Sequence, residues 1–229
     1  MTRSPVELLV ELGFPRRAVE EASRDYDAAA RRLFPMLLDR ARRVGADLPV
    51  RKLSQPDLPA HETKRLVYLA VRMAEPGTVI ETGTFNGTFS TFALQALHDA
   101  GRGRLVSLDV PARSPIPHAI DIPLPAGCEP GWIIPEELHD RFELVLGDAR
   151  ETLPRVLGDL GTISLFLHDS LHTIRHMTFE YRQAWRHLVP GGLLLSDDAY
   201  MTPALWWFTG LRRVRMLTAH EMAAVRKPV

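Results

Sequence analysis

The sequence predicts an α/β fold: a doubly wound parallel sheet with a helical extension at the N-terminus. From Thr78 onward, short apolar runs alternate with helical segments, which is the pattern of such a sheet. Two of these runs stop abruptly at acids, one at Asp169 and one at Asp197-Asp198, as buried parallel strands do when they deliver charged groups to one sheet edge. With 229 residues and 45% hydrophobic composition, the chain can bury the core of one such domain.

Composition and charge narrow the possible functions. Lysine plus arginine equals aspartate plus glutamate, at 28 each, so no global field favours nucleic acid or an anionic membrane. The single cysteine, Cys128, excludes an intramolecular disulfide and is compatible with a reducing cytosol. No apolar run approaches the ~18 residues of a membrane span, and the first residues lack the apolar core of a signal peptide. We expect a cytoplasmic protein that binds neither nucleic acid nor membranes.

The N-terminal third shows helical spacing and no convincing strand pattern. Apolar stripes at three-to-four-residue intervals run through residues 8–12, 33–37 and 66–73. Residues 47–59 hold three prolines and are expected to form a connector. We therefore expect residues 1–60 to form a helical extension that makes cap or oligomer contacts, and residues 61–229 to form the α/β domain.

The remaining elements follow in order along the chain. The expected strands cover residues 79–81, 105–109, 142–146, 163–167 and 192–196, with helices over 88–99 and 173–188 and a closing antiparallel pair over 213–218 and 222–226. Residues 111–135 contain seven prolines and interrupt the alternation of strands and helices. They are expected to form either a lid or a surface excursion. Trp132 within them is expected to be a packing anchor. The aromatic cluster Trp206-Trp207-Phe208 is either a dimer contact or a substrate wall.

The turn after the first strand reads Glu81-Thr-Gly-Thr-Phe-Asn-Gly-Thr88. Its glycines, Gly83 and Gly87, permit a tight turn and let a ligand approach the backbone, while the following helix offers N–H groups at its start. It is not the G-x-G-x-x-G dinucleotide fingerprint. Asp109 ends the second strand, where an acid can accept hydrogen bonds from ribose hydroxyls, and Asp148 follows the third. Such acids are also ordinary helix N-caps, but acids in register after successive strands favour a cofactor that carries a nucleoside.

Three carboxylates are expected to meet farther along the same edge. Asp169, Asp197 and Asp198 must either bind a cation or repel one another, which would raise their pKa values; a divalent ion with oxygen ligands is the simpler explanation. His172 adds a titratable group three residues after Asp169, on the same face if the chain turns helical there. The alternatives are that Asp197-Asp198 cap a helix and that His172 is a structural histidine. A zinc site of His168, His172 and His176 is weaker still, because the three would not share one helical face.

These motifs resemble those of class I S-adenosylmethionine-dependent methyltransferases over about residues 62–200. The similarity lies in E-T-G-T-F-N-G, the acid at Asp109, G-D-A at 147–149 and P-G-G at 190–192. The resemblance implies a Rossmann-like seven-stranded sheet whose last hairpin is reversed. It also implies that the cofactor lies over the carboxyl ends of the first strands, with Glu81 and Gly83 beside the methionine, Asp109 at the ribose and Asp148 near the adenine. The full set of cofactor-binding residues that it implies is Glu81, Gly83, Thr84, Asn86, Gly87, Asp109, Asp148, Ala149 and Asp169.

The acids resemble the metal site of magnesium-dependent O-methyltransferases. In the catechol and caffeoyl type the last ligand is usually Asn, and a lysine stands three residues after the first Asp; here these positions hold Asp198 and His172. That combination is more similar to macrolide-sugar O-methyltransferases and their cephamycin-biosynthesis relatives. The resemblance implies Mg²⁺ or another divalent cation at Asp169, Asp197 and Asp198, and a sugar or secondary metabolite as the acceptor. We also expect a homodimer or higher homo-oligomer.

The chemistry of methyl transfer favours the same arrangement. A sugar hydroxyl is a poor nucleophile, and a divalent cation that chelates two neighbouring oxygens lowers the pKa of the hydroxyl and fixes the direction of attack. His172 could then take the proton as the general base. We expect a metal-dependent O-methyltransferase acting in natural product biosynthesis. The alternatives are a metal-independent methyltransferase, or a non-catalytic accessory protein that binds S-adenosylmethionine.

Overall fold

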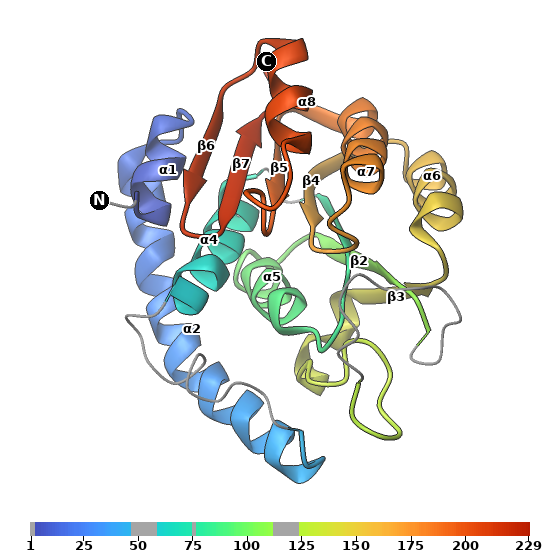
Figure 1. Ribbon diagram of the computed structural model, residues 1–229. Helices are drawn as coiled ribbons and strands as arrows, with labels where there is room; N and C mark the ends of the chain where they lie inside the picture. The colour runs from blue at the N-terminus through green and yellow to red at the C-terminus, as the bar shows by residue number, and fades with distance from the viewer. Residues whose placement is uncertain (1–2, 47–58, 75–76, 112–123) are drawn as a thin grey trace.

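The centre of the molecule is a seven-stranded sheet in the order β3-β2-β1-β4-β5-β7-β6 (Figure 1). The computed structural model describes residues 3–46, 59–74, 77–111 and 124–229. The first five strands are parallel, while β7 is antiparallel to both of its neighbours. The predicted reversal of the last hairpin is therefore confirmed. The strands are β1 Thr78–Thr82, β2 Arg104–Asp109, β3 Phe142–Leu146, β4 Ile163–His168, β5 Leu188–Ser196, β6 Met216–Ala219 and β7 Met222–Arg226.

Helices cover both faces of the sheet, as the α/β prediction requires. One face packs against α1 Pro5–Glu11, α2 Arg16–Arg43, α4 Pro59–Met73 and α5 Thr88–Asp99. The other packs against α6 Ala149–Leu160, α7 Ile174–His187 and α8 Ala204–Arg212, and a 3₁₀ helix, η1 Glu136–Arg141, precedes β3. Along β4, Leu165 and Leu167 point into the first core and Phe166 into the second, because side chains of a strand alternate between its faces.

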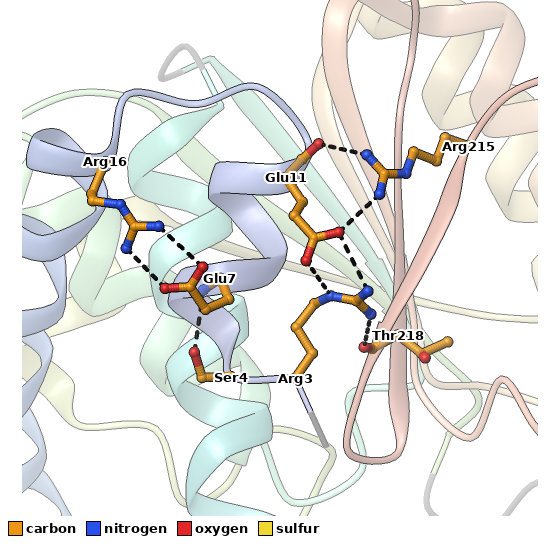
Figure 2. Close-up of polar contacts among 7 residues, drawn as sticks. All are labelled: Arg3, Ser4, Glu7, Glu11, Arg16, Arg215 and Thr218. Atoms are coloured by element: carbon orange, nitrogen blue, oxygen red, sulfur yellow. Dashed lines mark hydrogen bonds and ion pairs between the residues drawn. The ribbon is translucent and has the colours of Figure 1, made fainter. Parts of the chain in front are cut away.

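The N-terminal helices pack in the first core, and an ion pair also joins α1 to the β6 edge of the sheet. Glu11 of α1 is paired with Arg3 and with Arg215, the residue before β6 (Figure 2). Glu7 pairs with Arg16 at the start of α2, and Ser4 caps α1 by accepting a hydrogen bond from the Glu7 amide. Helix α1 is therefore joined to the β6 edge of the sheet by Glu11 and to α2 by Glu7. The helices of the described ranges are each too short or too polar to span a bilayer.

Most predicted elements are present, and two helices were missed. Helix α6 contains Pro154 and a glycine, which weaken its helical signal, and α8 contains the aromatic cluster that the sequence left unassigned. Strand β5 begins at Leu188 rather than at residue 192, and its register with β4 shifts between Ile163 and Leu165.

The proline-rich segments are only partly described. Residues 47–58 of the expected connector and residues 112–123 of the expected lid lie outside the described residues. In the remainder, Trp132 packs against the first core, which confirms it as a packing anchor. The segment is fixed to the turn after β1, because the Gly131 and Ile133 amides donate to the carbonyl oxygens of Phe85 and Asn86.

Candidate functional site

Main-chain hydrogen bonds continue beyond the strand ends and align the predicted site residues along one edge of the sheet. The Gly147 amide donates to the Asp109 carbonyl, and the Gly83 amide to the Leu108 carbonyl, both at 2.8 Å. On the other side of β1, the Asp169 amide donates to Thr82 at 2.8 Å and the Asp197 amide to His168 at 2.9 Å. The acids after β2, β3, β4 and β5 thus follow one another along the carboxyl edge, the position at which ligands bind in open α/β sheets.

The two glycines of the turn after β1 are required by the protein's own backbone. Gly83 has a φ of +88°, and a Cβ added there would overlap the carbonyl group of Asp169. Gly87 has a φ of +91°, and a Cβ there would lie 2.7 Å from Ile134 Cγ1 and 2.9 Å from Gly131 Cα. The sequence interpretation assigned this space to a ligand. The structure fills it with the loop after β4 and with the segment before η1.

The polar side chains of this turn shape its backbone. The Phe85 amide donates to Asp109 Oδ2 at 2.6 Å, so the acid that ends β2 holds the turn that follows β1. Asn86 Oδ1 accepts from both the amide and the hydroxyl of Thr88, the first residue of α5. Thr84 is buried, and its hydroxyl lies 2.7 Å from the hydroxyl of Ser107 on β2. These side chains therefore fix the shape of the turn.

Glu81 is fully buried on β1, and only one of its two oxygens is satisfied. Ser90 and Ser107 both donate to Oε2, whereas Oε1 has no hydrogen-bond partner among the described residues. Burial raises the pKa of Glu81 to about 7, although the two serine hydroxyls act against this. A buried acceptor without a partner fits a positively charged donor such as an ammonium group. The sequence interpretation missed both serines, because neither lies in a motif.

Asp148 has the alternative role expected for such acids, because it caps a helix. It is the N-cap residue of α6, and its side chain accepts a hydrogen bond from the Arg150 amide at 2.8 Å. Ala149 is the first residue of that helix. Both lie at the carboxyl edge beyond β3, one strand farther from β1 than Asp109.

Asp169 and Asp197 are neighbouring carboxyl groups at the carboxyl edge of the sheet, and the charge of Asp197 acts on Asp169. Burial, and then the charge of Asp197, raises the pKa of Asp169 well above its usual value; burial and the charge of Asp198 raise that of Asp197 to about 6. Hydrogen bonding from Asp169 acts against the rise in the pKa of Asp197, whose Oδ1 is buried without a partner among the described residues. The positive charge of Lys64, on α4, acts on both acids and lowers their pKa values. A divalent cation would relieve this repulsion more completely.

The third predicted ligand is oriented differently. Asp198 has a φ of +46°, a left-handed conformation that is uncommon for residues other than glycine, and it lies beside the exposed hydroxyl of Tyr200. Neither Asp197 nor Asp198 caps a helix, since α8 begins at Ala204 with Pro203 as its N-cap residue. Over the part of the chain that the structure describes, no group of three or more His, Cys, Asp or Glu side chains is arranged to hold a metal ion. The charge of Asp198 acts on both Asp169 and Asp197, but the three carboxyl groups are not arranged as a metal site.

His172 lies beside the acid pair, but not for the reason that the sequence suggested. Residues 169–173 are not helical, because α7 begins only at Ile174, so the expected helical face shared by Asp169 and His172 does not exist. A loop instead places His172 against the main chain of Asp197. Burial, and then the neighbouring His168, lowers the pKa of His172. Its Nε2 is buried and has no hydrogen-bond partner among the described residues.

A buried acid that the sequence interpretation missed connects the site to α7. Glu180 is fully buried and lies 2.6 Å from His168 Nδ1 and 2.8 Å from His176 Nε2. It also accepts hydrogen bonds from the hydroxyls of Thr82 and Ser170. Burial alone would raise the pKa of Glu180, but the hydrogen bonds and charges of the two histidines hold it well below its usual range. His168 and His176 therefore bind Glu180, which explains the spacing of the histidines without a zinc site.

Together the sheet order and the acidic edge define a class I S-adenosylmethionine-dependent methyltransferase fold. The chain belongs to a family of methyltransferase domains, whose pattern matches residues 80–199, just over half of its length. The resemblance inferred from the sequence is thereby confirmed at the level of the family. No curated protein sequence matches the chain.

Several solved structures share the fold at low sequence identity. The O-methyltransferase NovP is 15% identical, with a TM-score of 0.60, over 91% of this chain and 100% of its own. CalS11, a TDP-rhamnose 3'-O-methyltransferase of calicheamicin biosynthesis, is 18% identical, with a TM-score of 0.54, over 84% and 93%. MycE, a methyltransferase of mycinamycin biosynthesis solved with Mg and SAH, is 15% identical, with a TM-score of 0.51, over 84% of this chain and 54% of its own.

Proposed function

We propose that this protein is a metal-dependent O-methyltransferase that transfers the methyl group of S-adenosylmethionine to a hydroxyl of a small molecule, a sugar or other secondary metabolite. The observation that carries the proposal is the neighbouring carboxyl groups of Asp169 and Asp197, both with raised pKa values, which lie beside His172 at the carboxyl edge of the sheet. A pair of carboxylates can bind a cation, and an unpartnered imidazole nitrogen can accept a hydroxyl proton. A buried glutamate with an unsatisfied oxygen can bind an amine.

The residues after β1, β2 and β3 fit the cofactor. The unsatisfied Glu81 Oε1 suits the amino group of the methionine part, because a cationic donor would both satisfy this oxygen and stabilise its ionised form. Asp109 stands at the end of β2, where its carboxylate can accept from ribose hydroxyls. The start of α6 at Asp148 and Ala149 is one strand farther out, which suits the adenine.

The acids after β4 and β5 fit a divalent cation. Burial and neighbouring carboxylates raise the pKa values of Asp169 and Asp197, and Asp197 Oδ1 has no partner among the described residues. Asp169 and Asp197 are the residues that would hold the ion, since the structure does not bring Asp198 into a three-acid cluster with them, and hard oxygen ligands favour Mg²⁺. When bound, the ion supplies positive charge that lowers the pKa of the acceptor hydroxyl. The Mg in the MycE structure supports this proposal.

His172 is the residue that would accept the proton of the acceptor. Its lowered pKa keeps the imidazole neutral at physiological pH, and its Nε2 is not engaged by another described residue. As the hydroxyl proton passes to His172, the hydroxyl oxygen forms a bond to the methyl carbon, and the bond from that carbon to the sulfonium sulfur breaks. The activity named for CalS11 on TDP-rhamnose supports a sugar as the acceptor.

A labelled-methyl transfer assay on a panel of glycosylated natural products tests the proposal. We expect transfer that a chelator abolishes and Mg²⁺ restores, and that Asp197→Asn eliminates. The matched control is Asp159→Asn, an exposed acid on α6. Transfer that survives exhaustive chelation would favour a metal-independent methyltransferase, and binding of the methyl donor without any transfer would favour an accessory protein.

A further inference from the structure

The outer faces of α7 and α8 form a groove that the proposed methyl transfer does not use. This α7–α8 groove has a volume of about 600 Å³. Its lining runs along α7 from Ile174 to Arg186 and includes Trp207 of α8. At 1.5 Å per residue, this stretch of α7 is about 18 Å long, or roughly three helical turns.

The groove is strongly basic. Arg175, Arg182 and Arg186 line it and are exposed, and none of the three makes an ion pair or a side-chain hydrogen bond to another described residue. Glu180, the only acid of α7, is fully buried on the opposite side of the helix, where it binds His168 and His176. The exposed face of α7 therefore carries positive charge and no acid of its own. In addition, burial and the charges of Arg182 and Arg186 lower the pKa of Arg212 on α8.

Large apolar side chains accompany these arginines. Ile174 and Trp207, which line the groove, are 41% and 48% exposed. Trp206 and Leu211 of α8 are 66% and 79% exposed, whereas Leu205 and Phe208 on its other side are buried in the second core. Exposed aromatic and aliphatic groups beside arginine are typical of protein-binding surfaces.

We propose that the α7–α8 groove binds an acidic amphipathic helix of a partner protein. The apolar side chains of this helix would pack against Ile174 and Trp207, and its carboxylates would pair with Arg182 and Arg186. The lining is about 18 Å long, more than a small anion can span, and its exposed apolar groups beside arginines suit a partner that offers both acidic and apolar side chains. Two copies of this chain joined through the groove would place arginines opposite arginines, which disfavours a symmetric dimer.

The α7–α8 groove lies close to the proposed active site. Ile174 is two residues beyond His172, so a bound helix would lie next to the loop that carries the predicted base. Binding of a helix at this groove does not require methyl transfer at the site.

Fluorescence anisotropy with the full chain tests the proposal. The probe is a labelled 18-residue peptide with leucine at i, i+3, i+4 and i+7 spacing and glutamate elsewhere. We expect saturable binding that weakens with added salt and falls at least tenfold in Arg182→Glu/Arg186→Glu and in Trp207→Ala. The matched control is Arg24→Glu/Arg31→Glu, which makes the same charge change on exposed positions of α2 and should bind as the wild type does.

Other occupants give different results, each of which overturns the proposal. Equal binding of a lysine version of the peptide, or no effect of the groove variants, would show that the groove does not select an acidic helix. Tighter binding to phosphatidylserine vesicles that requires Trp207 would assign this face to a membrane. A dimer in sedimentation that Trp207→Ala dissociates, without peptide binding, would assign it to a second copy.

Discussion

Gly83 packs so closely against Asp169 that a single added carbon atom on Gly83 would overlap the Asp169 carbonyl group. The contact joins the turn after β1, where the cofactor is expected, to the loop after β4, where the metal is expected. Because the Asp169 amide also donates to the carbonyl of Thr82, a hydrogen bond holds the two segments together beside this contact. The cofactor and metal parts of the proposed site are therefore mechanically one unit.

Gly83→Ala should consequently impair both parts at once. The new Cβ would push the Asp169 main chain away, so we expect loss of methyl-donor binding and of metal-stimulated activity together, with both measured by calorimetry and the labelled-methyl assay. Gly101→Ala is the control, since Gly101 also has a positive φ, +68°, but nothing lies within 4 Å of its added Cβ. If Gly83→Ala lost only cofactor affinity, the contact would not couple the two loops.

His172→Gln should lower turnover by about 10²–10⁴, the usual contribution of positioned proton transfer. Affinity for the methyl donor and for Mg²⁺ should remain within a few-fold of the wild type, because neither is held by the imidazole. The lowered pKa of His172 means that the wild type keeps its activity to mildly acidic pH, and this acidic limb should flatten in the variant. His98→Gln, at an exposed position of α5, should behave as the wild type. Unchanged turnover in His172→Gln would leave a structural role for this residue.

Glu81 should make the ligand-free protein less stable as pH rises. Its folded pKa of about 7 lies above the ordinary value of 4.5, so its contribution is fully favourable below pH 4.5 and is lost as pH rises through 7. Thermal unfolding between pH 5 and pH 8 should show a weaker decline in Glu81→Gln than in the wild type. The difference corresponds to a few kcal/mol at most. Parallel pH profiles for the two proteins would contradict the raised pKa.

Removal of Glu180 should destabilise the fold strongly. Glu180→Ala leaves His168, His176, Thr82 and Ser170 without their shared acceptor, so we expect a loss of about 3–5 kcal/mol in the free energy of unfolding. Denaturant unfolding measures this loss, and Glu151→Ala, at an exposed position of α6, is the control. A loss below 1 kcal/mol would show that the buried network contributes little net stability.

The fold was predictable from the sequence because its signals are local. The apolar runs that end at Asp109, Asp169 and Asp197 mark buried strands by themselves, and β1 to β5 fall where these runs lie. Helix α8 was missed because two of its apolar residues, Trp206 and Trp207, face solvent and blur the helical stripe.

The site was predictable only in part, because much of it depends on distant contacts. The acids after β4 and β5 were identified from the strand ends, but the orientation of Asp198 depends on its left-handed backbone. Glu180 carries no motif; its role exists only because α7 packs so that residue 180 reaches residues 82 and 168. The i, i+4 pair of His176 and Glu180 was the one local signal that could have suggested it.

Adjacent residues of β1 anchor the site in opposite layers of the molecule. Glu81 is bonded to Ser90 of α5 on one face of the sheet, and Thr82 to Glu180 of α7 on the other. Substitutions in either layer would disturb the carboxyl edge of the sheet. Laboratory evolution toward new acceptors should therefore accumulate few changes in β1, α5 or the inner side of α7. Tolerated diversity should concentrate instead around Tyr200 and Met201, which are 70% and 51% exposed in the loop after β5 and carry no part of either core.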